Sequence, residues 1–153
     1  MSRLTLGALL VVVGLSGPAC SSAPSIEAMR TDPRCHAWAT GGLGHAGVVV
    51  VGDRSQIYGT MGKVEGAYYL DPSSIVYSGT FGQRKMGTYH APELVVHGSF
   101  GDLDPIEIGQ RRAVVRGALG GSLVVEYNDR CTDREAALGV VGIVIVAASH
   151  HHH

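Results

Sequence analysis

The side chains best suited to chemistry are histidines and carboxylates in the middle of this 153-residue chain. His90 and His97 stand seven residues apart, and the carboxylates Asp102, Asp104 and Glu107 follow. Carboxylates grouped in this way can serve in acid–base catalysis or bind calcium. Neither histidine has the His-x-x-x-His spacing of a zinc-ligand pair. We therefore expect solvated turn carboxylates and exposed strand histidines, with no metal and no other cofactor.

No nucleophile motif accompanies these residues. The segment Gly98-Ser99-Phe100-Gly101 lacks the Gly-x-Ser-x-Gly spacing of a nucleophile elbow. Catalysis would require a cleft that gathers His90, His97 and the carboxylates, and nothing in the spacing predicts one. The sequence therefore favours a protein that is not an enzyme.

Two tyrosines and two histidines are the candidates for a binding surface. Tyr58 and Tyr68 fall out of phase with the inward-facing positions of the predicted strands, so we expect them on an exposed face. His90 and His97 each lie near a predicted strand end, where they could meet across neighbouring strands. The sequence does not specify the ligand of such a surface.

Cysteine usage indicates an oxidising compartment. Cys35 and Cys131 flank the central part of the chain, and two such cysteines in an exported domain usually pair. We expect a disulfide between them, the alternatives being free thiols or pairing between chains.

The charge balance argues against nucleic acid as a partner. Twelve lysines and arginines face thirteen aspartates and glutamates, for a net charge of −1. Only Arg111-Arg112, with Arg116 nearby, forms a small basic cluster, which fits a solvated strand end better than a nucleic-acid footprint.

The N-terminal segment predicts export. Arg3 precedes an apolar run from Leu4 to Leu15, which is about a dozen residues where a membrane span needs about 20. We expect a signal peptide at residues 1–19, a tether at 20–34, one domain at 35–148 and a histidine tail at 149–153.

The end of the signal segment resembles the lipobox of bacterial lipoproteins. Ala19-Cys20 is followed by the small polar residues Ser21 and Ser22. The resemblance implies lipid on Cys20 and anchorage to a membrane of the cell envelope, at the outer membrane, in the periplasm or at the cell surface. Gly17 and Pro18 depart from the usual lipobox, so plain secretion is the alternative.

A glycine tetrad, Gly-x-(Leu/Met/Phe)-Gly, recurs along the predicted domain. The first glycines of successive tetrads are 18, 20, 19 and 19 residues apart, and such a period marks one supersecondary unit used repeatedly. Between the tetrads, apolar residues alternate with period two, as in Leu94, Val96 and Gly98, which predicts β-strands. We expect each unit to contain a longer strand running through its tetrad, a link, a shorter strand and a turn. The tetrads begin at Gly41, Gly59, Gly79, Gly98 and Gly117.

The cysteines help to choose among all-β folds. Five stacked solenoid turns would separate the two ends by roughly 20 Å, whereas a disulfide needs Cα atoms within about 7 Å. We therefore expect an antiparallel barrel or sandwich, or a trefoil-like set, of about five 19-residue hairpin units. A β-solenoid is the alternative. For that alternative, Val64-Glu65-Gly66 and the Val-Val-x-Gly runs at Val95 and Val114 resemble bactofilin-type β-helices, which implies a self-assembling polymer.

Two apolar features remain. Val76, Val95, Val114 and Val124 lie on the second face of the predicted strands, so this face is covered by another layer or forms an interface between copies. The run from Leu138 to Val146 predicts a final buried strand, with a short C-terminal helix as the alternative. Together the features predict an exported, lipid-anchored, non-enzymatic envelope protein that acts as a binding or structural module.

Overall fold

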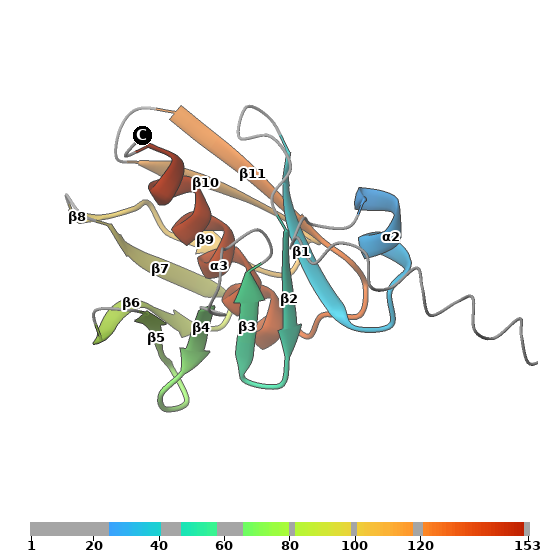
Figure 1. Ribbon diagram of the computed structural model, residues 1–153. Coiled ribbons are helices and arrows are strands. Elements are labelled where there is room, and N and C mark those ends of the chain that lie inside the picture. The colour runs from blue at the N-terminus through green and yellow to red at the C-terminus, as the bar shows by residue number, and fades with distance from the viewer. Residues whose placement is uncertain are drawn as a thin grey trace, which may run out of the picture.

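The computed structural model describes residues 25–40, 47–57, 66–79, 82–98, 101–117 and 121–151. These residues form an antiparallel sheet that curves around a helix, α3 (Asp133–His151), as Figure 1 shows. The predicted signal peptide, Cys20 and Tyr58 lie outside the described residues.

The strands follow one another along the sheet with few exceptions. The order is β10-β11-β1-β2-β3-β4-β5-β6-β7-β8, and β9 pairs with β7. The strands are β1 (Cys35–Thr40), β2 (Gly47–Val51), β3 (Arg54–Ile57), β4 (Gly66–Tyr69), β5 (Ser74–Gly79), β6 (Gly82–His90), β7 (Glu93–Gly98), β8 (Gly101–Asp102), β9 (Ile106–Glu107), β10 (Arg112–Gly117) and β11 (Gly121–Tyr127).

The sheet is nearly closed into a barrel. Strand β11 pairs with β1, so the first and last strands of the sequence are neighbours. At the other end, the Leu103 amide donates to Val96 in β7 and the Asp104 amide donates to Arg116 in β10. The predicted all-β antiparallel barrel is confirmed, and the parallel solenoid considered as an alternative is wrong.

The tetrad glycines that the structure describes, those of the third, fourth and fifth tetrads, lie at hairpin ends, contrary to the prediction that strands run through them; the tetrads at Gly41 and Gly59 lie outside the described residues. Gly79 pairs with Gly82, and Gly98 pairs with Gly101, each pair joining two neighbouring strands. Gly82 and Gly101 have φ values of +103° and +124°, which glycine adopts without the steric cost of a Cβ. In the units that begin at Gly79 and Gly98, the 19-residue period is therefore the tetrad turn, one strand, one turn and a second strand.

Helix α3 fills the inside of the barrel. Positions 136 to 143 are all buried, as expected for a helix surrounded by protein on every side. Gly139 and Gly142 bring the helix close to the sheet, because a Cβ there would lie 3.0 Å from Ala37 Cβ and Val48 Cγ2. The predicted buried strand at Leu138–Val146 is wrong. A nearly closed sheet leaves it no edge to pair with, whereas a helix satisfies its own backbone.

A second helix, α2 (Ile26–Thr31), lies within the segment predicted to be a tether. Ser25 caps it by accepting a hydrogen bond from the Ala28 amide at 3.1 Å. Met29 is fully buried, and Arg30 stacks over Trp38 at 5.8 Å. Helix α2 is therefore a folded element that packs on β1, within a segment for which a tether was predicted.

Candidate functional site

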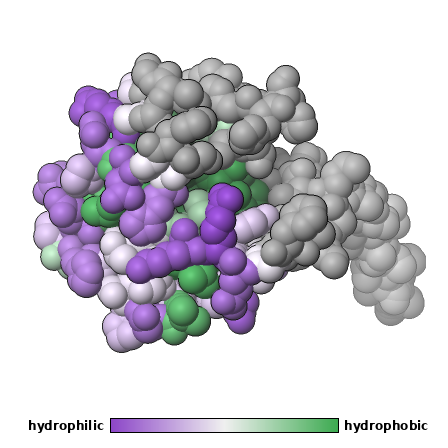
Figure 2. Space-filling view, turned by 90° about the vertical axis from the view of Figure 1, so that its left-hand side faces the viewer, coloured by the Kyte–Doolittle hydropathy of each residue, from purple (hydrophilic) through white to green (hydrophobic). Residues whose placement is uncertain are grey.

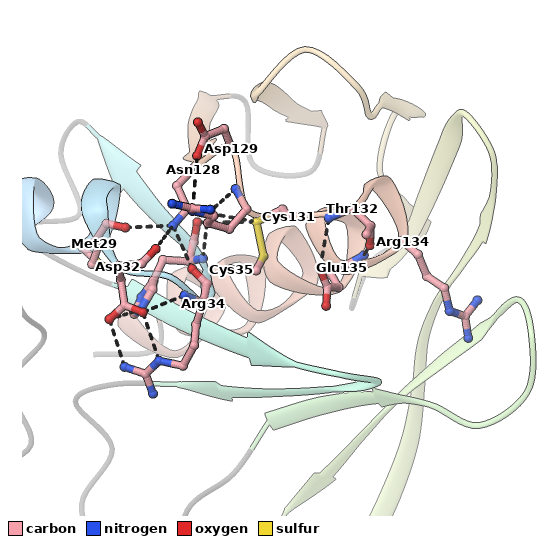
Figure 3. The surroundings of a disulfide bond; sticks show 12 residues. Met29, Asp32, Arg34, Cys35, Asn128, Asp129, Cys131, Thr132, Arg134 and Glu135 are labelled. Atoms are coloured by element: carbon pink, nitrogen blue, oxygen red, sulfur yellow. Dashed lines mark hydrogen bonds and ion pairs between the residues drawn. A yellow bond between two sulfur atoms is a disulfide. The ribbon is translucent and has the colours of Figure 1, made fainter.

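The disulfide between Cys35 and Cys131 is present, which confirms the predicted pairing (Figure 3). The Cα atoms are 4.5 Å apart, and the bond joins positions separated by 96 residues. It links the start of β1 to the segment that enters α3.

Asn128 organises the polar surroundings of this disulfide (Figure 3). Its side-chain amide donates to the carbonyls of Met29 and Arg34, each at 2.9 Å. Its Oδ1 accepts from the amides of His36 at 3.3 Å and Arg130 at 3.2 Å. Asn128 is buried, so this network ties α2, β1 and the end of β11 together as structure rather than as a catalytic centre.

A buried histidine adjoins the network. His36 is 1% exposed, and its Nε2 lies 3.4 Å from Asp32 Oδ2. Hydrogen bonds from Arg34 hold the pKa of Asp32 far below its usual range. Burial lowers the pKa of His36 despite the nearby carboxylate. His36 is therefore neutral at neutral pH.

His90 and His97, which could have met across neighbouring strands, do not meet. His90 pairs with Glu93 at one end of β7, and His97 pairs with Asp102 at the other end. His97 Nδ1 lies 2.7 Å from Asp102 Oδ1 on the surface. The hairpin register separates the two histidines by the length of β7, so they do not share one site with Tyr68.

Tyr68 lies in a groove on the outer face of the sheet. The groove has a volume of about 540 Å³, within the range of small-ligand sites. We call it the Tyr68 groove. The side chains that line it include Val49, Val51, Arg54, Gln56, Tyr68 and Ser78.

The strand register explains why these side chains gather. Val51 pairs with Arg54, Arg54 with Tyr68, and Tyr68 with Val76, so one row crosses β2 to β5. Val76 pairs in turn with Lys85 of β6. The alternate residues, Val48 and Val50 among them, belong to the core. The outer row therefore places Tyr68 and Val76 between two cations, Arg54 on one side and Lys85 on the other.

The floor of the Tyr68 groove is the seam between β3 and β4. Ser55 Oγ accepts from the Ala67 amide at 3.0 Å and donates to the Ala67 carbonyl at 3.2 Å. The two strands approach so closely that a Cβ on Gly66 would lie 1.9 Å from the Ser55 carbonyl oxygen. Among the described residues, Arg54 and Tyr68 are the one register pair between β3 and β4. Next to this pair, the Ser55 hydroxyl joins the two strands in place of a regular ladder of backbone hydrogen bonds.

Tyr68 is held from two sides. The Arg54 guanidinium carbon lies 5.0 Å from the centre of the Tyr68 ring, at cation–π distance. Gln83 of β6 donates its amide hydrogen to the Tyr68 hydroxyl. Among the described residues, no carboxylate lies within ion-pair distance of Arg54.

A second, smaller hollow of about 250 Å³ lies between α2 and β11. Trp38 Nε1 donates to Glu126 Oε1 at 3.2 Å, and Arg30 lies 3.9 Å from the same oxygen. Trp38 and Arg30 thus already have a partner in Glu126, so these two groups offer less to a ligand than the side chains of the Tyr68 groove do.

Figure 2 views the side of the barrel that carries β5 to β8. Polar groups there are interleaved with separate apolar patches. In the described ranges, no group of three or more histidines, cysteines, aspartates or glutamates is placed to hold a metal ion. None of the described helices has the length and apolar character to cross a bilayer.

No protein-family model, no curated protein and no solved structure matches the chain. The candidate site is therefore assigned from the geometry of this structure alone. Sequence reasoning singled out Tyr68 but missed Arg54, Gln56 and Gln83. Alternation along β3 could have placed Arg54 and Gln56 on the outer face, but only the cross-strand register puts them beside Tyr68.

Proposed function

We propose that this chain is an exported envelope protein, anchored by lipid on Cys20, that binds a ligand in the Tyr68 groove. The Cys35–Cys131 disulfide is the observation that carries the proposal. Structural disulfides of this kind form and persist in oxidising compartments. The export signal and the lipobox-like Ala19-Cys20 agree with that location.

The groove favours binding over catalysis. Its lining combines hydrogen-bonding side chains with exposed apolar carbon, as at Tyr68 and Val51. The described ranges contain two histidine–aspartate pairs, His97 with Asp102 and His36 with Asp32, and none of these residues lines the groove. We therefore infer a binding module rather than an enzyme.

The anchor can be tested directly in a bacterial host. The full chain is expressed with an alkyne-bearing fatty acid, and membranes and soluble fractions are compared. Cys20 should carry the label and the protein should sediment with membranes, whereas Cys20→Ala should lose both. Cys35→Ser is the matched control, because it removes a different thiol and should keep the label. Labelling that is absent from the unaltered chain would refute the anchor.

A further inference from the structure

We propose that the ligand of the Tyr68 groove is an anionic saccharide, a sugar unit that carries a carboxylate or a phosphate. This inference rests on the proposed binding function and names the chemistry of the same site. The charge, the hydrogen-bonding groups and the apolar contacts of the groove support it.

Arg54 supplies the anion-binding end. Its guanidinium carbon lies 5.0 Å from the centre of the Tyr68 ring, and this cation–π contact does not use up the five N–H donors of a guanidinium. A planar fork binds carboxylate or phosphate through two parallel hydrogen bonds. Because Arg54 has no carboxylate partner in the described part of the chain, its charge is available to a ligand.

A second cation extends the positive character of this face. Lys85 stands in the same cross-strand row as Arg54, three strands away and so roughly 14 Å from it. Among the residues that the structure describes, the groove lining contains no aspartate or glutamate. An anion is therefore the charged group that fits here, and a cationic ligand is disfavoured.

The other groups of the groove suit hydroxyls. Gln56, Ser78 and the Tyr68 hydroxyl can each donate and accept hydrogen bonds, as sugar hydroxyls also do. Val51 is 62% exposed beside them and offers an apolar contact for the C–H face of a ring. An acyl chain would leave the amide and hydroxyl groups unpaired, which makes a saccharide the better match.

Titration calorimetry on the full lipid-anchored chain in detergent tests this assignment. The probes are digalacturonate for a carboxylate, glucose 6-phosphate for a phosphate, and cellobiose as a neutral sugar. We expect at least one anionic probe to bind, and cellobiose to bind more weakly. Arg54→Gln should lower the affinity for the anionic probe by about tenfold or more, because a charge-assisted bidentate contact is lost.

Two further variants separate binding from folding. Arg54→Lys keeps the charge without the planar fork, so we expect an intermediate loss. Arg112→Gln removes an exposed arginine of β10 that does not line the groove, and it should bind like the unaltered chain. The inference is wrong if neither anionic probe binds, if cellobiose binds equally well, or if Arg54→Gln binds as tightly as the unaltered chain. None of these outcomes affects the lipid label on Cys20, so a failure here is distinct from a failure of the anchor.

Discussion

At the scale of single residues, the molecule depends on buried polar groups around its disulfide. The Asn128 side chain makes five hydrogen bonds to backbone groups of three separate segments. A buried amide with this many partners cannot be replaced by an apolar side chain without leaving backbone groups unpaired. Local sequence patterns could not predict this role of Asn128, because all its backbone partners except Arg130 lie more than 90 positions away.

Asn128→Ala should therefore lower the free energy of unfolding by about 2–4 kcal/mol, since the buried groups lose their partners. Urea unfolding under oxidising conditions measures this. Asp129→Ala is the matched control, because Asp129 is exposed and its change should stay within about 0.5 kcal/mol. Equal stability of the two variants would contradict the role assigned to Asn128.

His36 should make stability depend on pH. Burial lowers the folded-state pKa of His36 below its ordinary value of 6.5, so the unfolded chain takes up a proton first as pH falls. The contribution of neutral His36 to the free energy of unfolding is complete above about pH 6.5 and is lost as the pH falls below that value. Asp32, whose pKa is also lowered in the fold, adds a further loss below its ordinary value of 3.8.

Free energies of unfolding measured between pH 5 and pH 7.5 test this direction of the pH dependence. The unaltered chain should lose stability toward pH 5, and His36→Gln should show a shallower slope over the same range. His97→Gln, which removes a surface histidine, should keep the steeper slope. A slope that does not change in His36→Gln would show that another group is responsible.

At the scale of elements, local patterns predicted the strands well and the helices badly. The β-branched run Ile143–Val146 has strong strand propensity, but its position inside a nearly closed sheet requires a self-paired backbone. A motif at the start of this segment favoured a helix instead. Thr132 Oγ1 accepts from the Glu135 amide at 3.1 Å, and Glu135 Oε1 accepts from the Thr132 amide at 3.0 Å. This is the capping box Thr-x-x-Glu, which precedes the apolar run in the sequence.

The Tyr68 groove could be predicted only in part for a related reason. The alternation of β4 correctly put Tyr68 on the outer face, where it is half-buried. The neighbours of Tyr68 come from β3, β5 and β6, and their alignment depends on turns and on the bulge between Ile75 and Val76. A single shift of register would have moved Arg54 away from the ring.

The seam between β3 and β4 carries the element-scale prediction. Gly66→Ala should destabilise the protein by about 2–3 kcal/mol or more, because the new methyl group overlaps the Ser55 carbonyl oxygen. Thermal and urea unfolding measure the effect. Ser78→Ala, at the position paired with Gly66, is exposed and should change stability little. A Gly66→Ala protein as stable as Ser78→Ala would show that the strands are farther apart than described.

At the scale of the whole molecule, the near closure of the sheet into a barrel connects the sequence repeat with the disulfide. Five similar units would stack end to end in a solenoid, but here β11 returns to β1 and the two cysteines meet. The cysteines predicted this closure from the sequence, because their expected bond was incompatible with separated ends. The proposed binding site, the Tyr68 groove, lies on the outer face of the same barrel.

Removing the disulfide should cost the molecule much of its stability. The bond spans 96 positions, and loss of a link across a loop of this size lowers stability by about 3–5 kcal/mol. Urea unfolding of the Cys35→Ala, Cys131→Ala double variant measures this, with no reductant needed. A double variant within about 1 kcal/mol of the unaltered chain would contradict a stabilising role for the bond.

Intact mass spectrometry of the membrane-extracted protein, without reductant, tests the central claim most directly. An exported and lipid-anchored barrel should give a chain that begins at Cys20, carries lipid on that residue, and gains two hydrogens only when Cys35 and Cys131 are reduced. A chain that retains residues 1–19, has an unmodified Cys20 and contains free thiols at Cys35 and Cys131 would contradict the account.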